Sequence, residues 1–217
     1  MICLVSIGDA ILLGFIQGIT EWLPISSSGH LVIFQTLLGV EETVILDLML
    51  HVASLVVILV VFWRDLWGLV TGVLRKDPEM IRLVIQLILA SIPIAIVGVL
   101  VEDIIDRAFG NLLGVGICLL ITGTMLLLSR FPIQKDQSLT YKHAVIIGLF
   151  QAASVFPGIS RSGSSIAGGL MQGVAPQQSG RFGFLLAIPT IVGAVVDRKS
   201  TRLNSSHSDR SRMPSSA

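Results

Sequence analysis

Long apolar segments constrain this chain more than any other feature. A helix needs roughly 20 apolar residues, with a range of about 17–25, to cross a bilayer. The segments Val44–Trp63 and Ile81–Val101 meet that length, and Leu112–Leu128 is just long enough. These lengths predict an all-α integral membrane protein with several membrane-crossing helices. The full set of apolar blocks is Ile2–Ile19, Val44–Trp63, Ile81–Val101, Leu112–Leu128, Ala144–Phe156 and Phe182–Val196.

Composition supports a membrane protein. Hydrophobic residues make up 53% of the 217 residues and charged residues 13%, against about 25% charged in an average soluble domain. The net charge of +1 gives no reason to expect a nucleic-acid partner. Cys3 and Cys118 have neither disulfide-framework nor metal-site spacing, so we expect both to be packing residues.

Two of the apolar blocks do not form simple spans. The block Ala144–Phe156 is too short to cross, and the first block is interrupted at Gln17, Glu21 and Pro24. We interpret both as half-helices that enter the membrane and turn back. The sequence therefore predicts two re-entrant helical hairpins.

Loop charges indicate how the spans are oriented. The loops Arg64–Arg82 and Arg130–Lys142 are basic, whereas Glu102–Asn111 is acidic. Basic loops lie on the cytoplasmic side of a membrane. Glu41 then lies outside and Lys142 inside, so the two hairpins enter from opposite faces.

An internal repeat relates the two hairpins. When the chain is shifted by 134 positions, identical residues of the two broken segments align. Because the hairpins enter from opposite faces, we expect an inverted repeat, which places a binding site at the repeat interface. The aligned identities include Gly14 with Gly148, Gln17 with Gln151, Ile25 with Ile159, Ser26 with Ser160, Ser28 with Ser162 and Gly29 with Gly163.

The C-terminal 21 residues differ sharply from the rest. We assign residues 1–196 to one membrane domain and predict that Asp197–Ala217, rich in Ser and Arg, is a disordered polar tail. The abrupt change suggests read-through into foreign sequence after a truncation. A genuine polar tail is the alternative.

The first motif runs from Gln17 to His30. Gln17 and Glu21 share a helix face, and Pro24 ends that helix before Ser26–His30. A membrane-depth carboxylate indicates function, so Glu21 could bind a divalent cation or act as a base. Ser27 could be a nucleophile activated by His30. The structural alternatives are that Ser26 and Ser28 cap a helix and that His30 is structural.

The second motif is Pro157–Ser165, in which Arg161 lies between apolar stretches. Its guanidinium suits phosphate or carboxylate, and the neighbouring glycines and serines resemble an anion site at a helix N-terminus. Alternatively, Arg161 snorkels or pairs with Glu21 for structural reasons. Asp47 and His51, four residues apart, either line the same cavity or are satisfied internally.

Together, Glu21–His30 and Pro157–Gly163 closely resemble the undecaprenyl-diphosphate phosphatase family of the bacitracin-resistance type. The resemblance covers Met1–Val196. It implies a multi-pass enzyme of the bacterial inner (plasma) membrane that hydrolyses undecaprenyl diphosphate to undecaprenyl phosphate and inorganic phosphate. This reaction recycles the lipid carrier for peptidoglycan synthesis.

The resemblance also implies residue roles. Ser27 and His30 match the family's proposed catalytic serine and histidine, and Arg161 its phosphate-binding arginine. Gln17 and Glu21 match its acidic motif, and a divalent cation, Mg²⁺ or Ca²⁺, is expected there. The residues expected to bind substrate are Gln17, Ser26, Ser28, Ser160, Ser162 and Gly163.

Family members continue with further membrane helices beyond the matched region. The second repeat is therefore expected to be incomplete. Two alternatives to the enzyme remain at this point: a transporter or lipid flippase built on the same repeat, and an inactive truncated fragment. The expected partners are the polyprenyl diphosphate substrate and membrane lipids, and a homodimer is compatible with the sequence.

Overall fold

The chain is all-helical in the part that the structure describes, which confirms the all-α part of the predicted fold class. The computed structural model describes residues 5–40, 44–101, 111–131 and 137–211, without the side chains of 44, 45, 47, 48 and 194–211. Within these residues there is no β-strand, and an isolated bridge pairs Gln137 with Val174. The helices are α1 (Ile7–Trp22), α2 (Ser27–Leu38), α3 (Val44–Val61), α4 (Trp63–Leu74), α5 (Pro78–Leu100), α7 (Leu112–Leu128), α8 (Tyr141–Ala152), α9 (Arg161–Met171) and α10 (Pro176–Ser211), with a 3₁₀ turn at Ala153–Val155.

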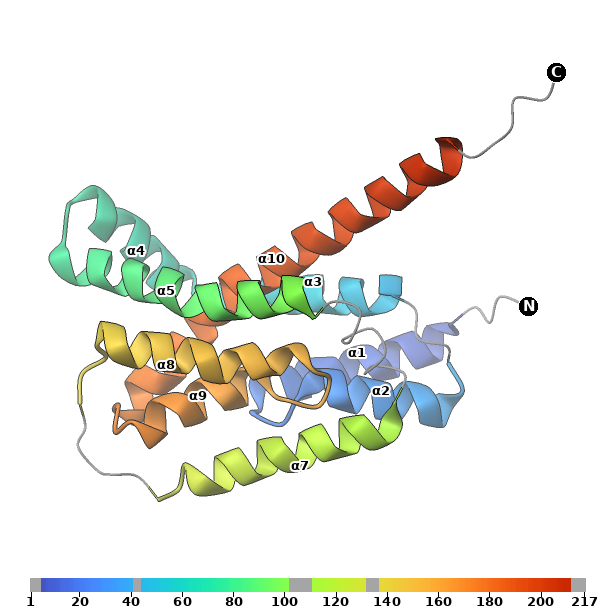
Figure 1. Cartoon of the computed structure of the whole chain (residues 1–217), viewed down its shortest axis with the longest axis horizontal. Helices are drawn as coiled ribbons and strands as arrows, with labels where there is room; N and C mark the ends of the chain where they lie inside the picture. Colours follow the sequence, from blue (N-terminus) through green and yellow to red (C-terminus); the bar gives the residue numbers. More distant parts are fainter. Residues whose placement is uncertain (1–4, 41–43, 102–110, 132–136, 212–217) are drawn as a thin grey trace.

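Two helical hairpins, α1–α2 and α8–α9, meet at the centre of the molecule. Figure 1 shows that they point in opposite directions along its long axis, so that their connecting turns lie near each other. The first turn follows Trp22 because Pro24 cannot continue α1. The second contains Pro157 and Gly158, the latter at a φ of 99° that favours glycine. Each hairpin thus turns where the sequence predicts a break.

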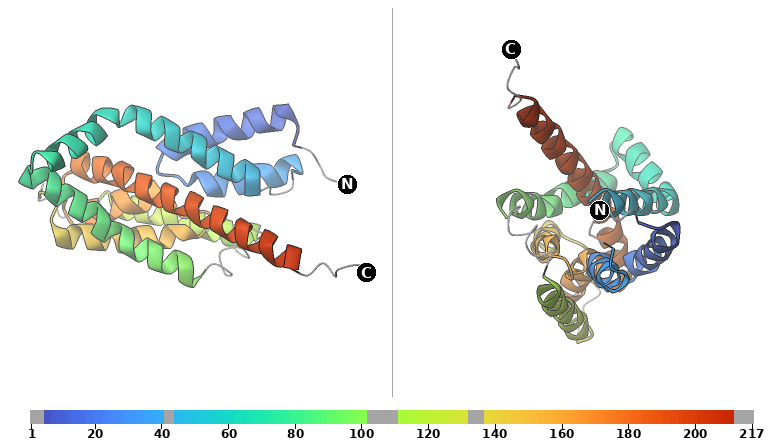
Figure 2. Two further views of the ribbon diagram at one scale, coloured as in Figure 1. Left: turned by 90° about the horizontal axis from the view of Figure 1, so that it is seen from above. Right: turned by 90° about the vertical axis from the view of Figure 1, so that its right-hand side faces the viewer.

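Apart from α4, the remaining helices pack against these hairpins, and the end-on view of Figure 2 shows that α1 lies at the outer edge of the bundle. Helix α5 packs against α8, α7 packs against α2 and α9, and α3 contacts α1 and α10. Helix α10 also packs along α9 and α5. Buried apolar side chains from α5, α8 and α10 form one core cluster, made of Ala90, Ala144, Ile147, Phe182 and Leu186.

The outer surface is strongly apolar. Large hydrophobic side chains are exposed on every face of the bundle, among them Val60 on α3, Val99 on α5 and Leu120 on α7, each at least 70% exposed. A soluble monomer rarely exposes such an area. In the described part of the chain, α5 is long and apolar enough to span a bilayer. The segments Met49–Val61 and Trp63–Leu74 qualify only as a pair bent by 68°. The surface therefore suits a lipid environment.

The structure differs from the sequence prediction at helix α4. Most of the predicted loop Arg64–Arg82 is the helix α4, whose Trp63 and Trp67 rings stack on one side while Asp65 pairs with Arg181 of α10 at 2.5 Å. The sequence analysis assigned a loop here because basic residues adjoin the apolar side chains, although these recur with the 3.6-residue spacing of a helix. Helix α10 runs from Pro176 to Ser211, and the predicted disorder of Asp197–Ala217 stays a prediction.

Some sequence predictions fall outside the described residues. They are the acidic loop after α5, the environment of Glu41 and Cys3, and the side chain of Asp47. Cys118 is a free thiol, as expected. The predicted foreign origin of residues 197–217 stays a prediction.

Candidate active site

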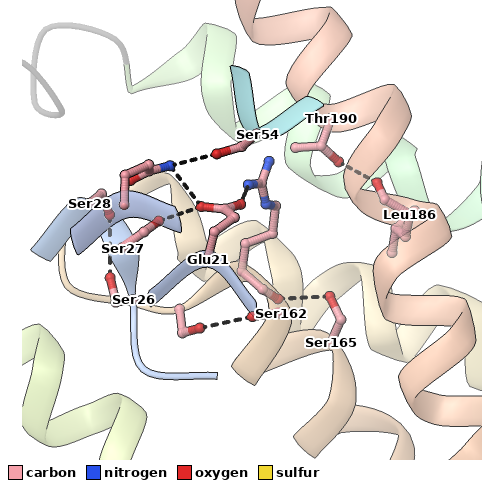
Figure 3. Close-up of polar contacts among 12 residues, drawn as sticks. Glu21, Ser26, Ser27, Ser28, Ser54, Ser162, Ser165, Leu186 and Thr190 are labelled. Carbon is pink, nitrogen blue, oxygen red and sulfur yellow. Dashed lines mark hydrogen bonds and ion pairs between the residues drawn. The ribbon is translucent and has the colours of Figure 1, made fainter. Parts of the chain in front are cut away.

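Glu21 lies at the centre of the candidate site and joins the two motifs. Its Oε1 accepts a hydrogen bond from Nη2 of Arg161, 140 residues away in sequence. Its Oε2 accepts from Nε2 of Gln17 at 3.0 Å and from the Ser27 hydroxyl at 2.5 Å. The side chains of Arg161 and Glu21 are only 17% and 9% exposed. The convergence of carboxylate and guanidinium, which the motifs predict, is confirmed (Figure 3).

His51 is a further neighbour of Glu21. It lies on α3 and interacts electrostatically with the Glu21 carboxylate. Ser54, one turn further along α3, accepts a hydrogen bond from Gln17 Nε2 at 3.2 Å. This face of α3 therefore lines the site, which agrees with the cavity-lining alternative for His51.

Two helix N-termini lie in the two motifs with matching geometry. Ser26 caps α2 by accepting from the Gly29 amide at 3.3 Å, and Ser160 caps α9 by accepting from the Gly163 amide at 3.0 Å. In each motif the capping hydroxyl is 3.3 Å from the hydroxyl two residues later, at Ser28 and Ser162. Capping is thus a structural role for Ser26. Helix N-termini also favour anions, because free amides and the helix dipole point there.

The two turns touch through glycines. A Cβ atom on Gly29 would lie 2.8 Å from the Cα of Gly158, and one on Gly163 would lie 2.9 Å from the carbonyl oxygen of Pro24. Real Cβ atoms do not approach backbone so closely, so both positions require glycine. These contacts are reciprocal, since the shift of 134 positions relates Gly29 to Gly163 and Pro24 to Gly158.

His30 is positioned by its own helix start. Its Nδ1 lies 2.7 Å from the carbonyl oxygen of Ser26. Because a carbonyl only accepts, Nδ1 carries the proton and Nε2 is the basic nitrogen of the neutral ring. The Ser27 hydroxyl donates to Glu21 rather than to His30. Ser26 itself has a φ of 69°, a conformation that costs a non-glycine residue about 1–3 kcal/mol.

Sequence reasoning missed several residues that build the site. Thr122 of α7 donates to the Gly158 carbonyl at 2.9 Å and accepts from the Ser160 amide at 3.0 Å, which fixes the second turn. Ser54 and Thr190 each accept a hydrogen bond from a buried glutamine. All three are hydroxyl residues within apolar helices. A single hydroxyl in an apolar run was the sequence feature that could have identified them.

The side-chain oxygens near Glu21 can be compared with the ligands that the expected divalent cation needs. In the described part of the chain, no group of three or more His, Cys, Asp or Glu side chains gathers to form a metal site. However, Oε1 of Gln17 is buried without a hydrogen-bond partner next to the Glu21 carboxylate. Mg²⁺ is often held by one or two protein oxygens together with substrate phosphates. The residues present fit that mode of binding.

Comparison with known proteins decides the family. The sequence matches the family described as "Bacitracin resistance protein BacA" over residues 10–214. The chain belongs to this family. Three proteins similar to this chain are each named undecaprenyl-diphosphatase. They come from Methanosphaera stadtmanae (41% identical, covering 88% of this chain and 76% of the relative), Thermosipho melanesiensis (39%, covering 90% and 79%) and Bacteroides thetaiotaomicron (42%, covering 85% and 72%).

Proposed function

We propose that this protein hydrolyses undecaprenyl diphosphate to undecaprenyl phosphate and inorganic phosphate, and so regenerates a lipid carrier for cell-wall synthesis. The names of its relatives support the substrate. The observation that carries the proposal is the contact between Glu21 and Arg161, two charged side chains brought together from separate motifs. Those names do not favour the transporter or flippase alternative.

The diphosphate would bind where the two helix N-termini meet. Arg161 would donate to its oxygens in competition with Glu21, and the amides capped by Ser26 and Ser160 would add partial positive charge. Ser28, Ser162 and Gly163 would supply further donors. Phosphoryl transfer depends mainly on such positioning and charge stabilisation.

In the reaction, an oxygen nucleophile attacks the terminal phosphorus and the P–O bond to the bridging oxygen breaks. The leaving group is undecaprenyl phosphate. Ser27 is one candidate nucleophile, because Glu21 accepts its hydroxyl hydrogen bond and can take its proton. A phosphoserine would then be hydrolysed by water. The other candidate is water, with His30 accepting its proton at Nε2.

A divalent cation, Mg²⁺ or Ca²⁺, would be held by Gln17 and Glu21. The unpaired carbonyl oxygen of Gln17 and the carboxylate of Glu21 are the hard oxygen donors that such ions prefer. The cation would neutralise part of the diphosphate charge.

We further propose that α1–α2 and α8–α9 are re-entrant hairpins of an inverted repeat in a multi-pass protein of the inner (plasma) membrane. At 1.5 Å per residue, α1 is about 24 Å long and α8 about 18 Å, both shorter than a hydrocarbon core of about 30 Å. Their opposite directions and the reciprocal glycine contacts support a twofold relation between the hairpins.

The test is phosphate release from a polyprenyl diphosphate by the purified protein in detergent with Mg²⁺. Arg161→Lys keeps the charge but removes the planar fork, and we expect kcat to fall at least about 100-fold. Arg181→Lys is the matched control, since Arg181 pairs with Asp65 away from the site, and it should stay within about twofold of wild type. Equal rates for the two variants would refute the assignment of Arg161.

A further inference from the structure

A continuous series of polar contacts crosses five helices with the Glu21–Arg161 pair at its middle. On one side, Gln17 of α1 donates from Nε2 to Glu21 and to Ser54 of α3. On the other side, the Ser165 hydroxyl of α9 contacts the Arg161 carbonyl at 2.9 Å. Ser165 thereby links the first turn of α9, which carries Arg161, to the helices that pack against α9.

The second side continues through a buried glutamine. The Ser165 hydroxyl also contacts Oε1 of Gln151, on α8, at 2.6 Å. Gln151 in turn donates from Nε2 to the hydroxyl of Thr190, on α10, at 2.7 Å. Gln151 and Ser165 are fully buried. The outer ends of the series, Ser54 and Thr190, are labelled in Figure 3.

The two sides are built alike. Gln17 and Gln151 are related by the shift of 134 positions, and each donates from Nε2 to a hydroxyl on a later helix, 37 and 39 residues further along the chain. Each glutamine is almost inaccessible to solvent, at 2% and 0% exposed. The same arrangement therefore occurs once in each hairpin, on α1 and on α8.

A buried amide has few acceptable orientations, because an unpaired polar group in an apolar surrounding is costly. The Ser54 hydroxyl fixes the Gln17 amide and, through it, Oε2 of Glu21. The Thr190 hydroxyl fixes Gln151 and, through Ser165, the first turn of α9. In the described part of the chain, neither hydroxyl forms a hydrogen bond with Glu21 or Arg161, so each acts through a glutamine.

We propose that Ser54 and Thr190 are positioning residues, which hold the carboxylate of Glu21 and the guanidinium of Arg161 in the geometry that the reaction requires. This inference rests on the proposed phosphatase function. It assigns the two hydroxyls to catalysis rather than only to stability.

Two other hydroxyls in the chain provide matched controls. Thr190 donates to the Leu186 carbonyl four residues earlier, and Thr124 of α7 makes the same contact with Leu120. Thr124→Val therefore removes the same backbone contact that Thr190→Val removes, at a more exposed position and without a glutamine contact. Ser91 of α5 donates to the Leu87 carbonyl and serves as the control for Ser54→Ala.

The first measurement is steady-state hydrolysis of a polyprenyl diphosphate. Ser54→Ala and Thr190→Val should each lower kcat about three- to tenfold, the effect of one hydrogen bond, with KM within about twofold. Ser91→Ala and Thr124→Val should leave both constants within about twofold. Ser54→Thr and Thr190→Ser retain a hydroxyl and should keep most of the wild-type kcat. Equal effects in test and control variants would overturn the proposal.

The second measurement does not depend on activity. Phenylglyoxal modifies accessible guanidinium groups, and peptide mass spectrometry reports the rate at Arg161, with Arg181 as an internal reference. Ser54→Ala and Thr190→Val should raise the rate at Arg161 about threefold or more, while the rate at Arg181 stays the same. An unchanged rate at Arg161 would overturn the positioning role. A wild-type protein that releases no phosphate would instead refute the proposed function, and the labelling result would still decide the positioning role.

Discussion

Glu21 and Arg161 each compensate the charge of the other. Removing one member of a mostly buried ion pair leaves an uncompensated charge, which costs about 3–5 kcal/mol. Substitutions that keep the charge are therefore better probes of chemistry than alanine. The anionic substrate would offer Arg161 a second partner, so that the pair can open without leaving either charge unsatisfied.

Ser27 is the residue whose substitution separates the two candidate nucleophiles. Its hydroxyl contacts the carboxylate that would accept its proton. We expect Ser27→Ala to lower kcat at least about 100-fold in the phosphate-release assay. Ser164→Ala is the control, because Ser164 is fully buried and its hydroxyl donates to the backbone carbonyl of Ser160. A loss of less than about tenfold for Ser27→Ala would favour water.

The dependence of activity on a divalent cation can also be tested at single residues. If Gln17 and Glu21 hold the cation, EDTA should lower activity at least about tenfold, and added Mg²⁺ or Ca²⁺ should restore it. Gln17→Leu should raise the half-saturating Mg²⁺ concentration about tenfold, because it removes a donor oxygen. Activity that is indifferent to EDTA would remove the cation from the mechanism.

At the scale of elements, the two hairpin turns depend on backbone contact. The α2 N-terminus lies against the second turn and the α9 N-terminus against the first, with glycine at both contacts. Any side chain there must separate the hairpins. The contact between Glu21 and Arg161 spans the same junction, so separation would also weaken the site.

Gly29→Ala and Gly163→Ala test this packing. Each adds a methyl group against backbone, an overpacking that costs about 1–3 kcal/mol, and should lower the thermal midpoint in detergent by about 3–10 °C. Gly123→Ala on α7 is the control, since nothing lies within 4 Å of its Cβ position, and it should be neutral or slightly stabilising. A similar midpoint for all three variants would mean that the turns do not pack as described.

For the whole molecule, the lipid-facing surface and the loop charges together determine orientation. A soluble monomer rarely exposes as many apolar side chains as α3, α5 and α7 do here. The basic connection between α4 and α5 contains Arg75 and Lys76, and basic connections stay in the cytoplasm. Asn111, at the start of α7, should then be on the outer side.

Cysteine labelling tests this topology. In a variant lacking Cys3 and Cys118, Lys76→Cys and Tyr141→Cys should react with a membrane-impermeant maleimide only in inverted vesicles. Asn111→Cys should react in intact cells. The expected pattern follows from the proposed topology, in which α5 and α7 each cross the bilayer once. Labelling of all three positions from one side would contradict a multi-pass arrangement.

The sequence by itself determined the element types, the hairpin breaks and most residues of the site. Apolar run length, proline and glycine act locally, so they can be interpreted without coordinates. This is why α5 and α7 were found near their observed bounds. The amphipathic helix α4 was missed, because the apolar pattern there is short and mixed with charge.

Only the tertiary structure decided which polar groups pair. Helix packing decides that Glu21 contacts Ser27, that His30 turns to the Ser26 carbonyl, and that Gln17 and Gln151 contact hydroxyls nearly 40 residues away. A buried polar side chain must find a partner, and the sequence states that need without naming the partner. Helix packing brings the partners together, which is why the glutamine contacts with Ser54 and Thr190 came from the fold alone.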